Sequence, residues 1–273
     1  FWYSTGLALR RHRLAAGVAG LGAVVVAGAG VVAWLQHLES RAHEERTAAV
    51  RDFMFELVSD AEASDGQQGD VTGRQMVEGA VERARRDFAD QPQLRGELLV
   101  ELGRMFVRLG ADEDAVPVLR EGVATLERVA PAQDPALNKG RVYLAGVLMD
   151  DGEDLAHVGL LARTAREACA TDEVDCVKAR AYAGNLLSQI ASFAGDDELA
   201  LEEMRRSAVD TEQAFGATHN ETVVAFMSLA VTARNAGHLR EAGDAMARAM
   251  TIASAVRMRA ADRAQLDRTM AII

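Results

Sequence analysis

The two cysteines, Cys169 and Cys176, are the only thiols in this chain of 273 residues. They enclose a loop short enough for a disulfide, and on the chain-entropy model such a bridge contributes roughly 2–3 kcal/mol. We expect the disulfide if the loop lies outside the cytoplasm, where such bonds persist. Two free thiols are the alternative. A metal site is less favoured, because no further soft ligand lies nearby in the sequence.

Other chemistry is not indicated by the sequence. No two histidines lie four residues apart with a carboxylate between them, so the zinc signature is missing. Neither a Gly-x-Ser-x-Gly nucleophile elbow nor a Walker loop occurs. We therefore expect no catalytic, cofactor-binding or metal-binding residues in this chain. The Asn220-Glu-Thr222 string fits a glycosylation acceptor and also a helix N-cap, and we expect the cap.

Four regularly spaced glycines mark the boundaries of the helices that would position any binding residues. Gly110, Gly152, Gly195 and Gly237 are spaced by 42, 43 and 42 residues, and each lies between two apolar helical patterns. A period of this size is typical of stacked helix pairs. Each glycine is expected to end the first helix of a pair so that the second folds back. An alanine follows each glycine by four or five residues: Ala115, Ala156, Ala200 and Ala242.

The offsets around these glycines match the tetratricopeptide repeat pattern of Leu-Gly, Tyr, Gly, Ala, Phe and Ala. The third and fourth repeats keep the offsets of the first, whereas the second slips by one, to Ala156 and Leu160. The period of about 42 exceeds the usual 34 and resembles the longer-helix variant of kinesin light chains and many bacterial sensors. We predict an all-α fold, an α-solenoid, with a generic helical array as the alternative. The first repeat reads Leu102-Gly103, Phe106, Gly110, Ala115, Leu119, Gly122.

The concave face of such a solenoid, lined by the first helix of each pair, is the predicted binding surface. Its arginines could hold a carboxylate or an acidic peptide. An ordinary solvated face is the alternative. The candidate residues, placed by the repeat pattern, are Arg104, Arg108, Tyr182, Asn185, Gln189, Arg234 and Asn235.

An uncharged stretch of 22 residues, 14–35, precedes the repeats. About 20 apolar residues suffice to span a bilayer as a helix. Arg10, Arg11 and Arg13 flank it, so the positive-inside rule places residues 1–13 in the cytoplasm and the repeats outside. A cleaved signal peptide, a twin-arginine signal and a buried core helix are alternatives that the length and flanking charge disfavour. Alanines every four residues could let two such helices pair, so a homodimer is possible.

Charge and composition complete the predicted organisation. The first 38 residues hold no acidic side chain, and the rest of the chain carries all 41 acidic residues with 27 of the 30 basic ones. Such a surface repels nucleic acid phosphate, so we expect no nucleic acid partner. The expected parts are a cytoplasmic segment 1–13, a transmembrane helix 14–35, a stalk helix 36–63, a linker 64–71, a packing helix 72–91, an array of four helix pairs 92–257 and a partial capping helix 258–273.

Residues 47–110 resemble the juxtamembrane and first-repeat region of bacterial membrane-anchored serine/threonine protein kinases. In that family a cytoplasmic kinase domain precedes a basic flank, one membrane helix and an external tetratricopeptide array. This chain lacks the kinase motifs, so no catalytic residue is carried over, and ATP and magnesium would serve only a kinase domain upstream. The resemblance rests on Arg10-Arg11-His12-Arg13-Leu14, Val50-Arg-Asp-Phe53, Gly69-Asp-Val-Thr72, Asp90-Gln-Pro92 and Leu98-Leu99.

The sequence therefore predicts an extracytoplasmic module that binds a protein or peptide, anchored in the inner membrane with its N-terminus in the cytoplasm. The resemblance implies that it is the sensor part of a serine/threonine protein kinase. A stand-alone anchored scaffold without kinase activity is the alternative. An enzyme with an unrecognised site is a third and weaker hypothesis.

Overall fold

The computed structural model describes residues 52–53, 73–150, 152, 154–256, 258 and 260–270. The predicted cytoplasmic segment 1–13, membrane helix 14–35 and linker 64–71 lie outside the described residues, as does nearly all of the stalk 36–63. Within the described ranges, no helix combines the length and apolar character needed to span a bilayer. The chain divides into two compact units, residues 1–62 and 63–273, and the second holds the helices α3 to α12.

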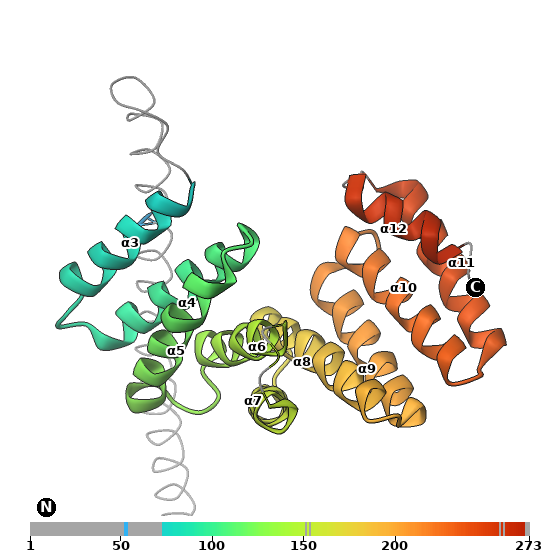
Figure 1. Cartoon of the computed structure of the whole chain (residues 1–273), viewed down its shortest axis with the longest axis horizontal. Coiled ribbons are helices and arrows are strands. Elements are labelled where there is room, and N and C mark those ends of the chain that lie inside the picture. The colour runs from blue at the N-terminus through green and yellow to red at the C-terminus, as the bar shows by residue number, and fades with distance from the viewer. Residues whose placement is uncertain are drawn as a thin grey trace, which may run out of the picture. The chain divides into compact units, whose positions relative to one another are not determined.

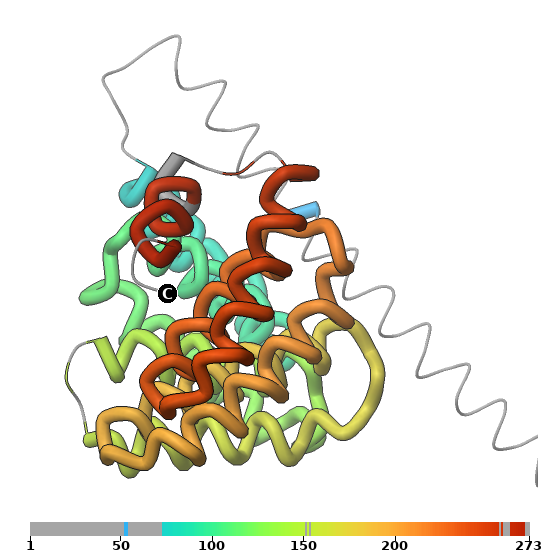
Figure 2. The backbone as a smooth tube through the Cα atoms, turned by 90° about the vertical axis from the view of Figure 1, so that its right-hand side faces the viewer, coloured from blue at the N-terminus to red at the C-terminus, as the bar shows by residue number. Residues whose placement is uncertain are grey.

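Every regular element in the described ranges is an α-helix, as the repeat pattern predicts (Figure 1). A leading helix, α3 (Gly73–Asp87), is followed by successive antiparallel pairs, and α12 (Ala260–Met270) comes last. Figure 2 shows α10 and α11 running side by side. The pairs are α4 (Pro92–Arg108) with α5 (Asp112–Val129), α6 (Pro135–Asp150) with α7 (Leu155–Ala168), α8 (Val174–Phe193) with α9 (Asp197–Phe215), and α10 (Asn220–Asn235) with α11 (Leu239–Ala255).

The repeated glycines end the first helix of each pair, which confirms their predicted role. Gly110, Gly152, Gly195 and Gly237 have φ values of 69°, 78°, 77° and 81°. This left-handed conformation lets the backbone leave the helix, and only glycine adopts it without a steric penalty from Cβ. At Gly195 the turn is closed by the N–H of Asp196, which donates to the carbonyl of Ala191 at 2.9 Å.

Replacing Gly195 with alanine should therefore destabilise the turn by roughly 1–2 kcal/mol, the cost of left-handed backbone for an L-residue. No atom lies within 4 Å of the Cβ that would be added, so the loss would come from backbone conformation alone. The matched control is Gly243→Ala inside α11, where space is also open and φ is helical. The control should gain up to about 1 kcal/mol. Chemical denaturation of both variants measures the difference.

The second helices of the pairs bury the predicted small and apolar positions in three of the four repeats. Ala115, Ala200 and Ala242 are no more than 1% exposed. In the second repeat the prediction is wrong, because Ala156 and Leu160 are both exposed, Leu160 by 57%. The burial of this helix therefore follows a different register.

The reason is the length of the turn before α7. Helices α5, α9 and α11 begin two residues after their glycines, but α7 begins three residues after Gly152. The side chain of Asp154 caps α7 by accepting the N–H of Ala156 at 3.0 Å. The extra residue shifts the register forward by one, so Val158 and Ala162 take the buried positions and both are fully buried.

Candidate binding site on the first helices of the pairs

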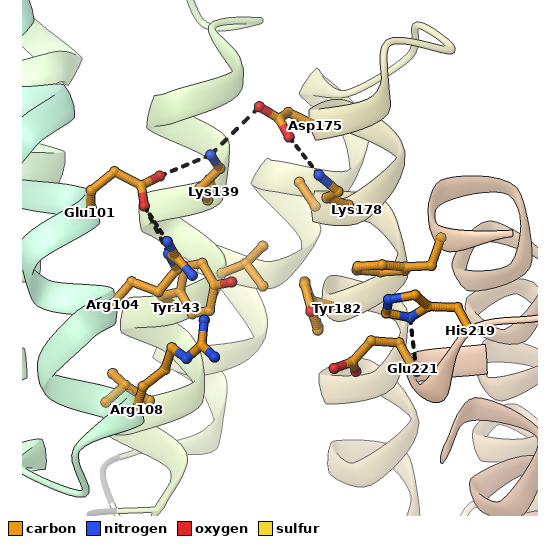
Figure 3. Close-up of a pocket in the computed structure, with 14 residues that line it drawn as sticks. Glu101, Arg104, Arg108, Lys139, Tyr143, Asp175, Lys178, Tyr182, His219 and Glu221 are labelled. Atoms are coloured by element: carbon orange, nitrogen blue, oxygen red, sulfur yellow. Dashed lines mark hydrogen bonds and ion pairs between the residues drawn. The ribbon is translucent and has the colours of Figure 1, made fainter. Parts of the chain in front are cut away.

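A cavity of about 540 Å³ lies where α4, α6, α8 and α10 face one another, and we call it the central pocket (Figure 3). These are the first helices of the four pairs, the ones that line the concave face of a helical-repeat array. The volume falls within the range of ligand sites in proteins. The central pocket is therefore the strongest candidate for a binding site among the described residues.

The composition of the central pocket differs from that of the rest of the chain. The chain has only two lysines, Lys139 and Lys178, and both line this pocket. Two of its three tyrosines, Tyr143 and Tyr182, line it as well. In a chain with a net charge of −11, the sequence thus places ammonium groups and phenol rings on this one surface.

Five charged side chains form a continuous series of ion pairs across the three helices α4, α6 and α8. Glu101 on α4 accepts from Arg104 Nη2 at 2.7 Å and from Lys139 Nζ of α6 at 3.0 Å. Lys139 also lies 3.6 Å from Asp175 of α8, which accepts from Lys178 Nζ at 3.1 Å. The side chains alternate in sign, so most of their charge is neutralised within the network (Figure 3).

Burial and opposite charge compete in setting the pKa values of this network. Burial alone would raise the pKa of Glu101, but Lys139 and Arg104 outweigh it and hold that pKa below its ordinary value. Asp175 behaves in the same way, with Lys139 as the main partner. Burial lowers the pKa of Lys139, yet Glu101 and Asp175 raise it further, so the net shift is upward. All of these groups remain charged at neutral pH.

The pKa shifts predict how stability depends on pH. A carboxyl group with a lowered pKa stabilises the folded state above its unfolded pKa, and this contribution is lost as pH falls through the folded pKa. We expect Glu101→Gln to lower the free energy of unfolding at pH 7 and to flatten its fall between about pH 5 and pH 3. The exposed Glu113 of α5 provides the control, Glu113→Gln, which should follow the unmodified chain. Denaturation curves at several pH values measure both effects.

Aromatic rings form a row beside the charges. The ring centroids of Tyr143 and Tyr182 lie 5.9 Å apart, and Phe215 meets Tyr182 edge-on at 6.4 Å. His219 stacks on Phe215 at 5.1 Å, and the ammonium of Lys178 lies 5.8 Å from the centre of the Phe215 ring. Burial raises the pKa of both tyrosines, so both phenols stay neutral. The row links α6, α8 and the start of α10 and offers apolar surface to a ligand.

The start of α10 differs from the prediction that Asn220 would cap it. The N-cap is His219, whose Nδ1 accepts the N–H of Glu221 at 3.1 Å. Phe215 holds the His219 ring by stacking, and this contact from the end of α9 aligns the acceptor with the helix. The same arrangement places Glu221 in the first turn of α10, at the edge of the central pocket.

The structure divides the predicted concave-face residues between two cavities. Arg104, Arg108 and Tyr182 line the central pocket. A second cavity of about 450 Å³ lies between α8, α10 and α12, and Asn185, Gln189 and Asn235 line it with other uncharged residues. Arg234 lines neither cavity and donates to the Oδ1 of Asn235 at 3.0 Å. The sequence pattern thus identified parts of two neighbouring surfaces.

The lysines and Tyr143 were missed because the repeats were aligned on their glycines. Lys139 and Tyr143 take the same positions, counted from the start of α6, as Lys178 and Tyr182 from the start of α8. Their spacing is 39 residues, which equals the separation of the two helix starts. Helix α8 has 20 residues and α6 has 16, so the glycine period contains an extra turn of α8. Counting from the helix starts would have revealed the equivalence.

The two cysteines are free thiols in the structure, so the predicted disulfide is not formed here. Cys169 is the C-cap residue of α7, and Cys176 lies in the first turn of α8; both are at most 1% exposed. Burial, together with a hydrogen bond that the Cys169 thiol donates to Cys176, raises the pKa of Cys169 and keeps it a thiol at neutral pH. Because the two thiols already face each other, the disulfide stays a prediction for an oxidising compartment.

Comparison with known proteins finds similar folds among solved structures. No family model matches the chain, and no curated protein matches it either. Among solved structures, BtubC (BKLC) from P. vanneervenii is similar, with 16% identity, a TM-score of 0.54, and coverage of 68% of this chain and 76% of BtubC.

Two structures of a candidate kinesin light chain from Podosopora anserina, with nearly identical TPR-like repeats, are also similar. Their identities are 18% and 17%, and their TM-scores are 0.48 and 0.47. The matches cover 65% and 66% of this chain and 86% and 88% of those chains. At these identities the likeness concerns the fold. The described helices form an array of antiparallel pairs like that of tetratricopeptide repeats.

Proposed function

We propose that this chain is a membrane-anchored extracytoplasmic sensor module that binds a protein or peptide through the central pocket. The observation that carries the proposal is the pocket itself. It joins the first helices of all four pairs, and it gathers both lysines and two tyrosines of the chain. A ligand bound there would contact four repeats at once, so its binding would couple their relative positions.

The anchoring part of the proposal rests on the sequence. The apolar stretch 14–35 and its arginine flank support one membrane helix with the repeats outside the cytoplasm. The resemblance of residues 47–110 supports a place at the C-terminal end of a bacterial serine/threonine protein kinase. In that arrangement, occupancy of the pocket is transmitted through the membrane helix to a cytoplasmic kinase domain.

A stand-alone scaffold is the second candidate. The 273 residues contain no kinase motif, and a helical array needs none to gather envelope proteins. The coding sequence upstream of Phe1 separates the two candidates, because a kinase would add an Asp-Phe-Gly and an Ala-Pro-Glu motif there. Reporter fusions after residue 273 test the topology that both candidates share, and a cytoplasmic signal would contradict both.

Photo-crosslinking tests the proposed binding surface directly. A benzophenone amino acid replaces Tyr182 in the pocket of the full chain, and a matched variant carries it at Leu160, which is 57% exposed on α7. In native membranes we expect a discrete protein or peptide adduct from position 182 and none of that mass from position 160. A second substitution, Arg108→Glu, should weaken the adduct. Equal labelling from both positions, or none from position 182, would overturn the proposal.

A further inference from the structure

The two outer walls of the central pocket carry opposite charges. On the α4 wall, Arg108 projects below Arg104, and on the α10 wall Glu221 lies beyond Tyr182 (Figure 3). The negative charge of Glu221 raises the pKa values of Tyr143 and Tyr182, and the positive charge of Arg104 lowers them. The tyrosines therefore lie between the positive and the negative wall.

Most other charges of the pocket are neutralised internally. Glu101 is bound by Arg104 and Lys139, and Asp175 by Lys139 and Lys178. Among the residues drawn in Figure 3, the guanidinium of Arg108 and the carboxylate of Glu221 make no hydrogen bond or ion pair. Only the backbone N–H of Glu221 is engaged, by His219. These two groups are the charges left for a ligand.

The aromatic row explains why the negative wall suits a cation. Tyr182 lies beside Glu221 (Figure 3), and its ring face attracts a positive group that the carboxylate also binds. The pocket already contains one such contact, because Lys178 lies 5.8 Å from the centre of the Phe215 ring. A volume of about 540 Å³ admits a few residues of extended chain, not a folded domain.

We propose that the central pocket binds a dipolar peptide segment, a short stretch that carries one acidic and one basic group. The acidic group pairs with Arg108 on α4, and the basic group pairs with Glu221 against the ring of Tyr182 on α8. A segment with acidic groups alone would bring a carboxylate against Glu221. A segment with basic groups alone would meet Arg108 and Arg104. This inference rests on the proposed binding function and specifies the charge of its ligand.

Three labelled peptides measure this preference on the full chain by fluorescence anisotropy. The dipolar probe is acetyl-Glu-Gly-Gly-Gly-Lys-amide, and the two controls replace its lysine by glutamate or its glutamate by lysine. We expect the dipolar probe to bind about tenfold more tightly than either control, a difference typical of one charge-assisted contact. Equal or tighter binding of the all-acidic probe would overturn the inference.

Substitutions of the two charged residues test whether Arg108 and Glu221 are the groups that bind the probe. Arg108→Gln and Glu221→Gln should each weaken binding of the dipolar probe by about fivefold to tenfold. The controls Arg240→Gln on α11 and Glu113→Gln on α5 remove exposed charges elsewhere and should leave it unchanged. The single reversals Arg108→Glu and Glu221→Arg should abolish binding.

Combining the two reversals should restore binding, because the probe can lie in the opposite direction. Failure of the double variant to bind, with its helical circular dichroism and melting curve intact, contradicts the inference. If the double variant does not fold, the two glutamine variants decide the matter. If the three probes bind equally but position 182 still gives the crosslinked adduct, only the inference of a dipolar ligand is wrong. If the adduct from position 182 is also lost, the proposed binding function is wrong as well.

Discussion

Replacing Phe106 with alanine is expected to lower the free energy of unfolding by about 3–5 kcal/mol, the range measured for buried aromatic residues. The Phe106 side chain is 1% exposed and lies in α4, which packs against α3, α5 and α6. Removing the ring leaves a cavity among these helices, which relax only partly because their other packing contacts hold them in place. Guanidinium denaturation followed by circular dichroism measures the change.

The matched control is Phe193→Ala at the end of α8. Its side chain is 69% exposed, so the ring buries little apolar surface in the folded chain and its removal costs little stability. We expect a change within about 0.5 kcal/mol, as for other surface substitutions. If both variants lost the same stability, Phe106 would not be part of a packed core between the helices, and the account of the first repeat would be wrong.

The second large effect is expected from Gly103→Ala. A Cβ at this position would lie 2.6 Å from Cγ and 2.7 Å from Cδ2 of Leu119, the fully buried residue of the paired helix α5. The leucine cannot withdraw into open space, so α4 and α5 must separate or the side chain must leave its rotamer. We expect a loss of about 1–3 kcal/mol, as in other overpacked cores.

Gly146→Ala provides the opposite outcome in a comparable place. Gly146 also lies inside a first helix, α6, but no atom lies within 4 Å of the Cβ that would be added. Alanine favours the helix over glycine by about 1 kcal/mol, so this variant should be more stable than the unmodified chain. The same change in stability for both variants, or a stabilised Gly103→Ala, would show that α4 and α5 do not approach closely at Gly103.

Much of the helical array was predictable because it depends on backbone geometry that the sequence shows directly. The glycine period predicted helix ends, and the positive φ at Gly110 and Gly195 explains why glycine stands there. The register of the second repeat was not predictable from the period. A single extra residue before α7 moves the buried position from five to six residues after the glycine, to Val158, whereas the sequence pattern had pointed to Ala156. Periodicity cannot detect where an insertion of one residue is absorbed.

The candidate site was predictable only in part, for a related reason. Arg104 and Arg108 were found because they lie on the first helix of a well-aligned repeat. Glu221 was missed because it lies at a helix start, close to α8 only in the folded chain. Pairing across helices, as between Glu101 and Lys139, depends on distances between repeats that no local pattern contains.

The pocket also explains why lysine is confined to two positions in an arginine-rich chain. Lys139 and Lys178 each bind a carboxylate of the neighbouring first helix or of their own helix, with a compact ammonium group in a half-buried place. A planar guanidinium would need more room and additional acceptors there. The reactivity of these two amines therefore reports whether the pocket is occupied.

Amine footprinting of the full chain tests the binding surface most directly. An acetylating reagent modifies Lys139 and Lys178, and mass spectrometry follows the rate at each position with and without the protein or peptide captured at position 182. The account predicts that the bound partner slows acetylation of both lysines together. Unchanged rates at both positions in a saturated complex would show that the partner binds elsewhere.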